Sequence, residues 1–303
     1  MKYAITYNRN FKYLDVVDEV ILYWSTKDDI VDFVKEKFPN QDQRITISVN
    51  AIDEFNFDMI YAAAVELKKV HNNMSLRFEA NDMDTKELIK LKDSGIRYYF
   101  EQQCSSLDKL YGLTMLGASD VIITEELAFD LPQVSAYCKS RGIKIRVFPN
   151  VAQNNGYGLA TVIPDIKKFF IRPEDVEIYE KYVDIFEIWG APEKTSVLYE
   201  IYKQQQWLGS LKDIITGFTE DVPNTGFMKH FALCRLNCGK KCFKGVKCDM
   251  CNLMKNISKE MTEDGFMLQT EKKPIISNDT TIEKIMPTAR NDFDEVSEEG
   301  IEE

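Results

Sequence analysis

Short runs of β-branched and aromatic residues alternate with longer segments of helical spacing from residue 1 to about residue 215. In the segment 28–38, apolar residues recur at Ile30, Val34 and Phe38, which is the spacing of one face of an amphipathic helix. Nine runs have the composition of strands: AITY at 4–7, EVILYW at 19–24, RITISVN at 44–50, SLRFEAN at 75–81, IRYYF at 96–100, DVIIT at 120–124, IKIRVFPN at 143–150, KKFFIR at 167–172 and DIFEIWG at 184–190.

Glycine residues mark the ends of several predicted helices. Gly95, Gly117 and Gly142 each stand just before the next strand run, where glycine commonly terminates a helix. Asp84 precedes a helical segment and is a predicted N-cap. The strand–helix unit repeats about every 24 residues, and this regular order indicates βα units around a parallel sheet.

The number of strand runs bears on the architecture. Eight parallel strands form a closed barrel, and eight runs are counted from EVILYW onward. AITY makes a ninth, so one run is either an additional strand or not a strand. An open, doubly wound α/β sheet is the competing architecture, but we find no glycine-rich phosphate loop of the kind that accompanies it. We therefore predict an α/β fold of the (β/α)8 TIM-like barrel class.

The alternation weakens after Gly209, and the rest of the chain differs in composition. We predict a (β/α) barrel over residues 1–215, a cysteine-rich metal-binding segment over residues 216–265 that includes a short helix near 254–261, and an acidic flexible tail over residues 266–303. Residues 292–303 carry seven acidic side chains and no basic one, which is typical of a solvated, disordered segment.

Composition narrows the classes of function. The 303 residues carry a net charge of −11, so non-specific binding to nucleic acid is not the expected activity. No apolar run approaches the roughly 18 residues of a membrane span. The first residues lack the apolar core of a signal peptide. We expect a cytoplasmic protein with no membrane partner, in a compartment where clustered cysteines more often bind metal than form disulfides.

Five of the seven cysteines form a cluster within eighteen residues, with the spacing Cys-x3-Cys-x3-Cys-x5-Cys-x2-Cys. A tetrahedral metal site needs four such ligands on turn-rich backbone, and a Cys-x2-Cys pair lets two sulfur atoms reach one ion. The pattern predicts a metal site, with one cysteine in excess. Disulfides or unpaired structural thiols are the alternative. The predicted ligands, called the cysteine cluster below, are Cys234, Cys238, Cys242, Cys248 and Cys251.

Basic residues surround the cysteine cluster in an otherwise acidic chain. Nearby cations favour the thiolate form that binds metal. The same residues form a possible RNA-binding patch. Spacing leaves zinc and a [4Fe-4S] cluster equally open, because neither the ferredoxin run nor the Cys-x3-Cys-x2-Cys run is present. The cations are Arg235, Lys240, Lys241, Lys244, Lys247 and Lys255.

Two stretches resemble the collagenase-like peptidase family, whose mechanism is unclassified. LGASDVIITEELAFDLPQVSAYCKSRGIKIRVF (116–148) is similar to a stretch in which a helix ends in LGA and leads to a strand, a helix and the next strand. FFIRPEDVEIYEKYVDIFEIWG (169–190) is similar to a later stretch whose strand ends in a Lys-Ile-Glu-Gly-like sequence, here Glu-Ile-Trp-Gly. The matches cover about a third of the chain.

The resemblance implies a (β/α)8-like barrel and a cysteine-bound [4Fe-4S] cluster, because several members carry one and take part in oxygen-independent hydroxylation of RNA or quinone precursors. The sequence departs from the family where its members have His-Gly-Ala, since Pro149, Asn150 and Val151 stand there. Residues 150–230 also contain no cysteine, so ligands do not carry over position by position. The cysteine cluster either replaces the family site or is a separate zinc module.

In a barrel, function sits where the strands end. Glu79, Glu101 and Glu125 end neighbouring strand runs, and we predict them as the catalytic carboxylates. Acids and amides at such positions also cap helices and form turns, which is the structural alternative. The full set at strand ends is Asn50, Glu79, Asn81, Glu101, Gln102, Glu125, Asn150, Arg172 and Glu187.

Two histidines and two isolated cysteines complete the candidates. His71 is predicted to end a helix, and His230 is a possible additional metal ligand. Cys104 and Cys138 are predicted to be buried, and the alternative for Cys104, which follows a strand run, is a position facing the active end of the barrel. Two functions stay open: a peptidase-family-like barrel enzyme with a cysteine-bound metal centre, acting on a macromolecule or a biosynthetic precursor, and a non-catalytic scaffold with a structural zinc knuckle.

Overall fold

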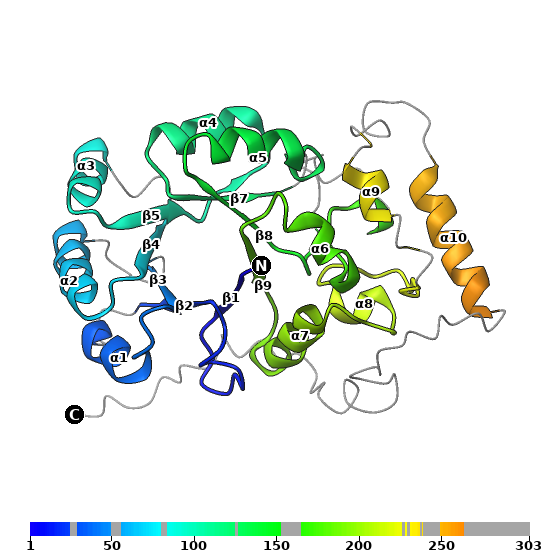
Figure 1. The fold of residues 1–303 in the computed structure, drawn as a ribbon, viewed down its shortest axis with the longest axis horizontal. Coiled ribbons are helices and arrows are strands. Elements are labelled where there is room, and N and C mark those ends of the chain that lie inside the picture. The colour runs from blue at the N-terminus through cyan, green and yellow to red at the C-terminus, as the bar shows by residue number, and fades with distance from the viewer. Residues whose placement is uncertain are drawn as a thin grey trace, which may run out of the picture.

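The computed structural model shows parallel strands arranged in a ring, with helices packed around the outside (Figure 1). It describes residues 1–24, 29–49, 56–79, 84–124, 127–152, 165–225, 228, 231–236, 238 and 249–263. The strands are β1 (Tyr3–Thr6), β2 (Glu19–Tyr23), β3 (Arg44–Ser48), β4 (Met74–Phe78), β5 (Arg97–Phe100), β6 (Gln103–Cys104), β7 (Asp120–Ile123), β8 (Lys144–Val147) and β9 (Ile185–Ile188).

Strand order explains how nine strands form an eight-position barrel. The sheet runs β5-β4-β3-β2-β1-β9-β8-β7-β6, and every pairing is parallel. β5 pairs with β4, whereas β6, two residues further along the chain, pairs with β7. The Ser119 amide donates to the Tyr98 carbonyl at 2.8 Å and links the two edges. β5 and β6 therefore share one position, and the predicted barrel class is confirmed in a nearly closed form.

Of the nine predicted strand runs, KKFFIR at 167–172 is wrong. It lies between a 3-10 turn, Asp165–Lys167, and a second one, Pro173–Asp175. Its apolar side chains are buried, as in a strand, but its backbone groups bond elsewhere. The Ile171 amide donates to the Pro149 carbonyl, and the Ile171 carbonyl accepts from the Tyr202 hydroxyl. A short apolar run cannot by itself distinguish a strand from a buried irregular segment.

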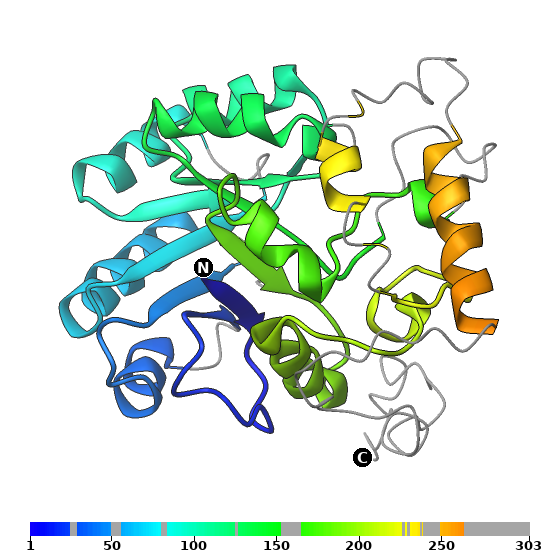
Figure 2. The same ribbon diagram turned by 45° about the vertical axis from the view of Figure 1, so that its right-hand side comes forward.

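Helices surround the ring and contribute their apolar faces to one large hydrophobic core. Figure 2 shows α9 and α10 next to each other on one flank of the barrel. The helices are α1 (Ile30–Lys37), α2 (Phe57–Val70), α3 (Thr85–Asp93), α4 (Leu107–Met115), α5 (Leu131–Lys139), α6 (Val176–Tyr179), α7 (Pro192–Gln204), α8 (Leu211–Ile214), α9 (Phe231–Leu236) and α10 (Met250–Glu263).

The predicted helix ends agree with the structure. Gly95, Gly117 and Gly142 have φ values of 64°, 85° and 69°, the left-handed region that glycine adopts without strain. After each of them, the next residue's amide donates to a carbonyl five positions back, as Ile96 does to Leu91 at 3.0 Å, which is the Schellman arrangement. Asp84 caps α3 in a reciprocal capping box with Glu87. These stops fix where each following strand begins.

Candidate functional site

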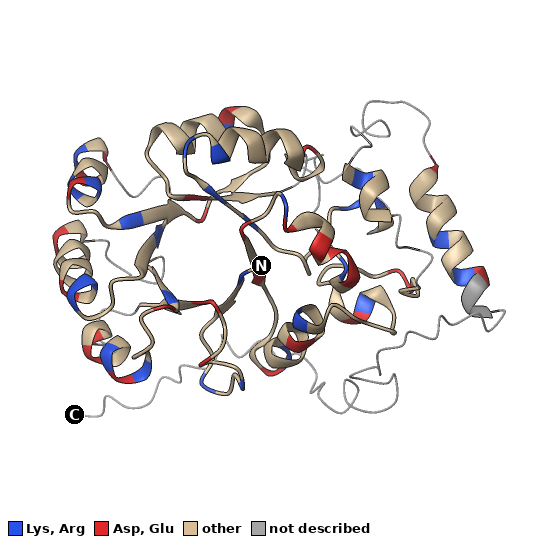
Figure 3. Ribbon diagram, in the orientation of Figure 1, with Lys and Arg blue, Asp and Glu red and all other residues tan. Residues whose placement is uncertain are grey.

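The inside of the barrel carries buried charged side chains beside two small apolar clusters. Figure 3 shows basic and acidic positions on the strands themselves as well as on the outer helices. Side chains alternate between the two faces of a strand, so the charged residue of each pair points inward while its apolar neighbour packs under a helix. The members of this interior ion network are Glu19, Arg44, Arg77, Asp120, Arg146 and Glu187, all buried.

Arg146 is the centre of the interior ion network. Its Nε donates to Asp120 at 2.9 Å, its Nη2 donates to both carboxylate oxygens of Glu19, and its Nη1 reaches Glu187 at 3.5 Å. Arg44 binds both oxygens of Asp120, at 2.6 and 3.1 Å. The three arginines therefore balance the three carboxylates in a region from which water is excluded.

Two carboxylates of the network, Asp120 and Glu19, have lowered pKa values. Burial alone would raise the pKa of Asp120, but the adjoining Arg44 and Arg146 guanidinium groups hold it well below its usual range. The pKa of Glu19 is lowered in the same way, against burial, by Arg146 and Arg44. Burial by itself would lower the pKa of Arg146. The nearby anionic groups raise this pKa well above its usual value instead, and Glu19 has the strongest effect among them.

Tyr99 forms the platform on which the arginines converge. The guanidinium carbon of Arg146 lies 4.4 Å from its ring centroid, and those of Arg44 and Arg77 lie 5.9 and 6.0 Å away. Within the described residues, the buried Tyr99 hydroxyl has no hydrogen-bond partner. The same holds for three other buried atoms of this interior: Ser48 Oγ, Arg77 Nε and Thr124 Oγ1. Unpartnered buried polar atoms are rare, and a cluster of them points to a function.

Three of these four residues are neighbours across adjacent strands. Ser48 on β3 is in register with Arg77 on β4, which is in register with Tyr99 on β5. Thr124 follows β7 on the face that Asp120 and Ile122 present to the interior. All four stand toward the carboxyl ends of their strands, which is the functional end of a parallel barrel.

The predicted catalytic carboxylates stand at this end. Glu79 and Glu101 follow paired strands, and the Glu101 amide donates to the Phe78 carbonyl at 2.7 Å. Glu79 is exposed, whereas Glu101 accepts from Arg77 Nη2 at 3.0 Å with its side chain 35% exposed. Glu125 lies outside the described residues, as do Asn50 and Asn81. The structure thus brings two of the three predicted carboxylates side by side.

Other strand-end candidates have structural partners. Both side-chain atoms of Asn150 bond the Trp189 backbone and tie β8 to β9. Arg172 stands at no strand end: it is buried and forms a two-bond ion pair with Asp175 at 2.6 Å. Glu187 belongs to the interior ion network, and Gln102 is exposed. The side chains of Tyr23 and Trp189, at the ends of β2 and β9, are about half exposed.

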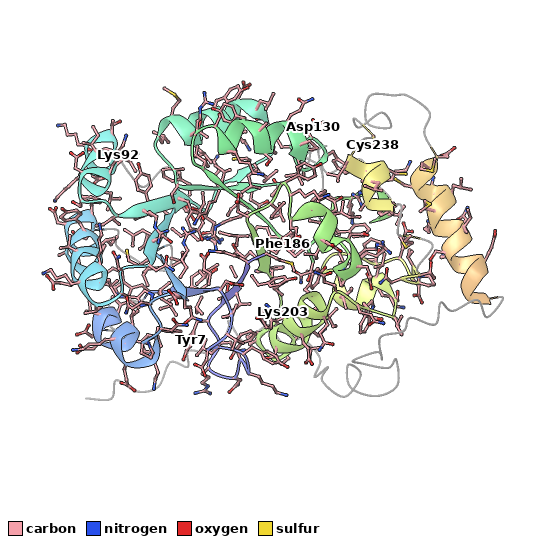
Figure 4. All side chains as sticks on the ribbon, in the orientation of Figure 1. Tyr7, Lys92, Asp130, Phe186, Lys203 and Cys238 are labelled. Atoms are coloured by element: carbon pink, nitrogen blue, oxygen red, sulfur yellow. The ribbon has the colours of Figure 1, made fainter. Side chains whose placement is uncertain are left out.

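The cysteine cluster is only partly described. Cys234 lies in α9, Cys238 lies just beyond its end (Figure 4), and Cys251 is in the first turn of α10. All three are partly buried and none of the three forms a disulfide. Cys242, Cys248 and His230 lie outside the described residues. Over the described ranges, no three or more His, Cys, Asp or Glu side chains are grouped as they would be around a metal ion.

Arg235 of α9 is buried next to Cys234 in the chain. Its guanidinium lies 4.7 Å from the Phe170 ring, 4.9 Å from Phe231 and 5.0 Å from Phe129, and its Nη2 donates to the Lys168 carbonyl. Counting only described residues, its Nε and Nη1 have no hydrogen-bond partner. Burial lowers the pKa of Arg235, and Tyr179, Cys251 and Cys238 are near enough to oppose that effect.

The remaining thiols and the described histidine are structural, as predicted. Cys104 and Cys138 are fully buried, and burial raises their pKa values to about 12 and about 11, so both are protonated thiols. His71 is the C-cap of α2, and its ring Nε2 lies 2.8 Å from the Gln43 carbonyl.

The fold and the interior ion network define the chain as a parallel barrel protein. The end of the barrel at which the strands terminate is lined by polar side chains. No protein-family model matches the sequence, and no curated protein sequence matches it. Among solved structures, the chain is similar to a glycerol uptake operon antiterminator-related protein from Thermotoga maritima, with 15% identity, a TM-score of 0.35, and coverage of 61% of this chain and 92% of that one.

The chain is also similar to an amidohydrolase from Burkholderia ambifaria with bound zinc, with 14% identity, a TM-score of 0.36, and coverage of 82% of this chain and 70% of that one. Neither protein is described as a collagenase-like peptidase. At 14–15% sequence identity and TM-scores of 0.35–0.36, these similarities support no statement about activity. Across the described part of the chain, every helix is too short or too polar to cross a membrane.

Proposed function

We propose that the protein is a barrel enzyme of the collagenase-like peptidase group, with its active site at the carboxyl ends of the strands and a metal centre held by the cysteine cluster. The buried Arg235 carries the metal part of this proposal. A buried cation with two nitrogen atoms that have no hydrogen-bond partner among the described residues is costly, and Cys238 and Cys251 border the same core. Four thiolates around Zn²⁺ or around a [4Fe-4S]²⁺ core leave a net charge of −2, which would complement this arginine.

The ligands would be four of Cys234, Cys238, Cys242, Cys248 and Cys251. Cys251 in the first turn of α10 suits a thiolate, because the amino end of a helix carries partial positive charge. The two metals would supply different chemistry: an iron–sulfur cluster would transfer electrons, and a four-thiolate zinc would be structural. We favour iron–sulfur on the resemblance to the peptidase family.

At the barrel end, Glu101 and Glu79 are the candidates for proton transfer, with Glu125 as the third predicted carboxylate. The proposed substrate is a macromolecule or a biosynthetic precursor. RNA is a proposed partner through the basic residues around the cysteine cluster. The alternative function is that of a non-catalytic scaffold, in which the barrel has no enzymatic activity and the cysteine cluster binds a structural zinc ion.

Metal and sulfide analysis after purification without oxygen tests these functions. Brown protein with visible absorbance and acid-labile sulfide supports the enzyme, and colourless protein with one zinc per chain supports the scaffold. Cys248→Ser and Cys251→Ser should each reduce the metal content, whereas the control Cys138→Ala, which removes a buried thiol far along the chain from the cluster, should keep it. Full metal content in both cluster variants, or no metal in the unaltered protein, overturns the metal proposal.

A further inference from the structure

We propose that Arg77 binds a substrate carboxylate inside the barrel and that Glu101 occupies this position until the substrate arrives. The proposal deepens the proposed function by naming a substrate class for the same barrel end, and its significance for turnover rests on that function. The five N–H groups of Arg77 are only partly satisfied by hydrogen bonds within the described part of the structure. Nη1 donates to Glu187 at 3.0 Å, Nη2 donates to Glu101 at 3.0 Å, and Nε has no partner among the described residues.

Nε, which has no partner among the described residues, and Nη2, which donates one bond, lie on the same edge of the Arg77 guanidinium. Nε–H and the adjacent Nη2–H point the same way, and this edge matches the two oxygens of a carboxylate. Glu101 meets that edge with a single bond from Nη2. A carboxylate placed squarely on it would accept two parallel bonds, so the exchange would replace one hydrogen bond with two.

Burial indicates which partner of Arg77 can leave. The side chain of Glu187 is 3% exposed and also accepts from Arg146, so it is fixed within the network. The side chain of Glu101 is 35% exposed and follows the last residue of β5, on the solvent side of Arg77. Rotation of Glu101 into water would uncover the Arg77 edge without disturbing the rest of the interior.

Charge balance selects the class of ligand. Without Glu101, the three buried arginines match Glu19, Asp120 and Glu187 one for one. A monocarboxylate therefore replaces the charge of Glu101 without adding to it, whereas a phosphate dianion would bring in an extra, uncompensated negative charge. A neutral amide would leave Arg77 without the charge that Glu101 supplied.

The unpartnered hydroxyls complete the site. Ser48 and Tyr99 are in register with Arg77 on the strands to either side, and both hydroxyls are buried and unpartnered within the described part of the chain. Each can donate to an oxygen bound at Arg77. A carboxylate there would satisfy Arg77 Nε together with these groups, which the protein alone leaves without partners.

Calorimetric titration with sodium acetate tests the proposal, with acetamide as the neutral isostere and inorganic phosphate as the alternative anion, all at one ionic strength. Acetate should bind saturably, and acetamide and phosphate should not. Glu101→Ala should tighten acetate binding about tenfold, because the competing carboxylate is gone, and Tyr99→Phe should weaken it about fivefold for one lost hydrogen bond. Arg77→Lys should abolish saturable binding, and the exposed Arg141→Lys is the matched control.

Several results would overturn the inference: acetate binding that Glu101→Ala leaves unchanged or weakens, equal binding of acetate and acetamide, or binding of phosphate alone. The Glu101→Ala and Tyr99→Phe measurements keep the test decisive if Arg77→Lys does not fold. These titrations read binding without turnover. Failure to bind acetate would leave the metal proposal intact, and absence of metal would leave the carboxylate site intact.

Discussion

The molecule contains two buried arginines in opposite surroundings, Arg146 inside the barrel and Arg235 on its flank. Arg146 contacts three carboxylates, whereas Arg235 is enclosed by phenylalanine rings and bonds one backbone carbonyl. Their pKa values accordingly move in opposite directions, upward for Arg146 and downward for Arg235. Each arginine of the barrel interior forms an ion pair with a buried carboxylate, whereas Arg235 forms no ion pair with a described residue, although Asp175 is near enough to raise its pKa.

This difference in charge pairing suggests different roles for the barrel interior and for the flank around Arg235. Complete ion networks of high geometric quality hold strands in one register, because each charge is strongly disfavoured without its partner. An aromatic enclosure around a cation that forms no ion pair with the described residues is suited to receive an anion from elsewhere. The interior ion network therefore serves as scaffold, and the two proposed binding sites lie at its Arg77 edge and on the flank beside Arg235.

The largest expected effect on stability tests the ion pairing of the barrel interior. Arg146→Met should lower the free energy of unfolding by about 3–5 kcal/mol, because it removes the closest cation from the buried Glu19 and a second cation from Asp120 and Glu187. Urea unfolding followed by circular dichroism measures the loss. Arg141→Met, which removes an exposed arginine stacked on Tyr137, is the control and should cost about 0.5 kcal/mol. Equal losses in the two variants would refute the ionic account of the interior.

Acid should weaken the interior in a defined pH range. The pKa of Glu19 is lowered in the folded state, so its ionised form stabilises the fold above the unfolded value of about 4.3, and this stability is lost as the pH falls from there toward the lower folded-state pKa. As the pH falls below about 4.3, the unaltered protein should lose more stability than Glu19→Gln, which has no proton to gain at this position. Urea midpoints at half-unit pH steps measure the difference. Parallel pH profiles for the two proteins would contradict the prediction.

Local sequence signals were enough to predict much of the fold. The stops at Gly95, Gly117 and Gly142 and the cap at Asp84 follow from backbone geometry alone, and the strand–helix order gave the barrel class. The run 167–172 failed because burial and apolar composition do not reveal which partner the backbone will bond. That information is carried by Pro149 and Tyr202, which are distant in the chain.

The site was harder to predict. Arg44, Arg77 and Arg146 each alternate with apolar residues inside strand runs, and strands of a parallel barrel are covered on both faces. That pattern indicates a charged interior and was available in the sequence. The pairing was not, because Arg146 and Glu19 are 127 residues apart and Arg77 and Glu187 are 110 apart. Only the closed sheet brings such charges together.

A smaller effect concerns Glu174, a carboxylate of the flank. Burial raises its pKa, against the opposing influence of Arg172, although it accepts from the Trp207 amide at 2.6 Å and from Asn224 at 2.9 Å. The folded protein therefore keeps this proton at a pH where the unfolded chain has lost it. Relative to Glu174→Gln, the unaltered protein should lose stability as the pH rises from 4 to 7, by less than the Glu19 effect and with the opposite sign. Urea midpoints across that range measure it, and a difference that rises with pH would show that the flank behaves like the interior.

The smallest expected effect is the most informative about the flank. In metal-free protein, Arg235→Met should change the free energy of unfolding by less than about 1 kcal/mol in either direction, because methionine fills the aromatic enclosure and removes a cation whose Nε and Nη1 have no partner in the described structure. Heat and urea unfolding of the variant beside Arg146→Met measure the contrast directly. If the cysteine cluster binds metal as proposed, the same substitution should remove part of the stability that the metal adds, since it would delete the buried cation near Cys238 and Cys251. A loss as large as that of Arg146→Met without metal would mean that Arg235 already has its counter-charge, and the flank would then be as complete as the barrel interior.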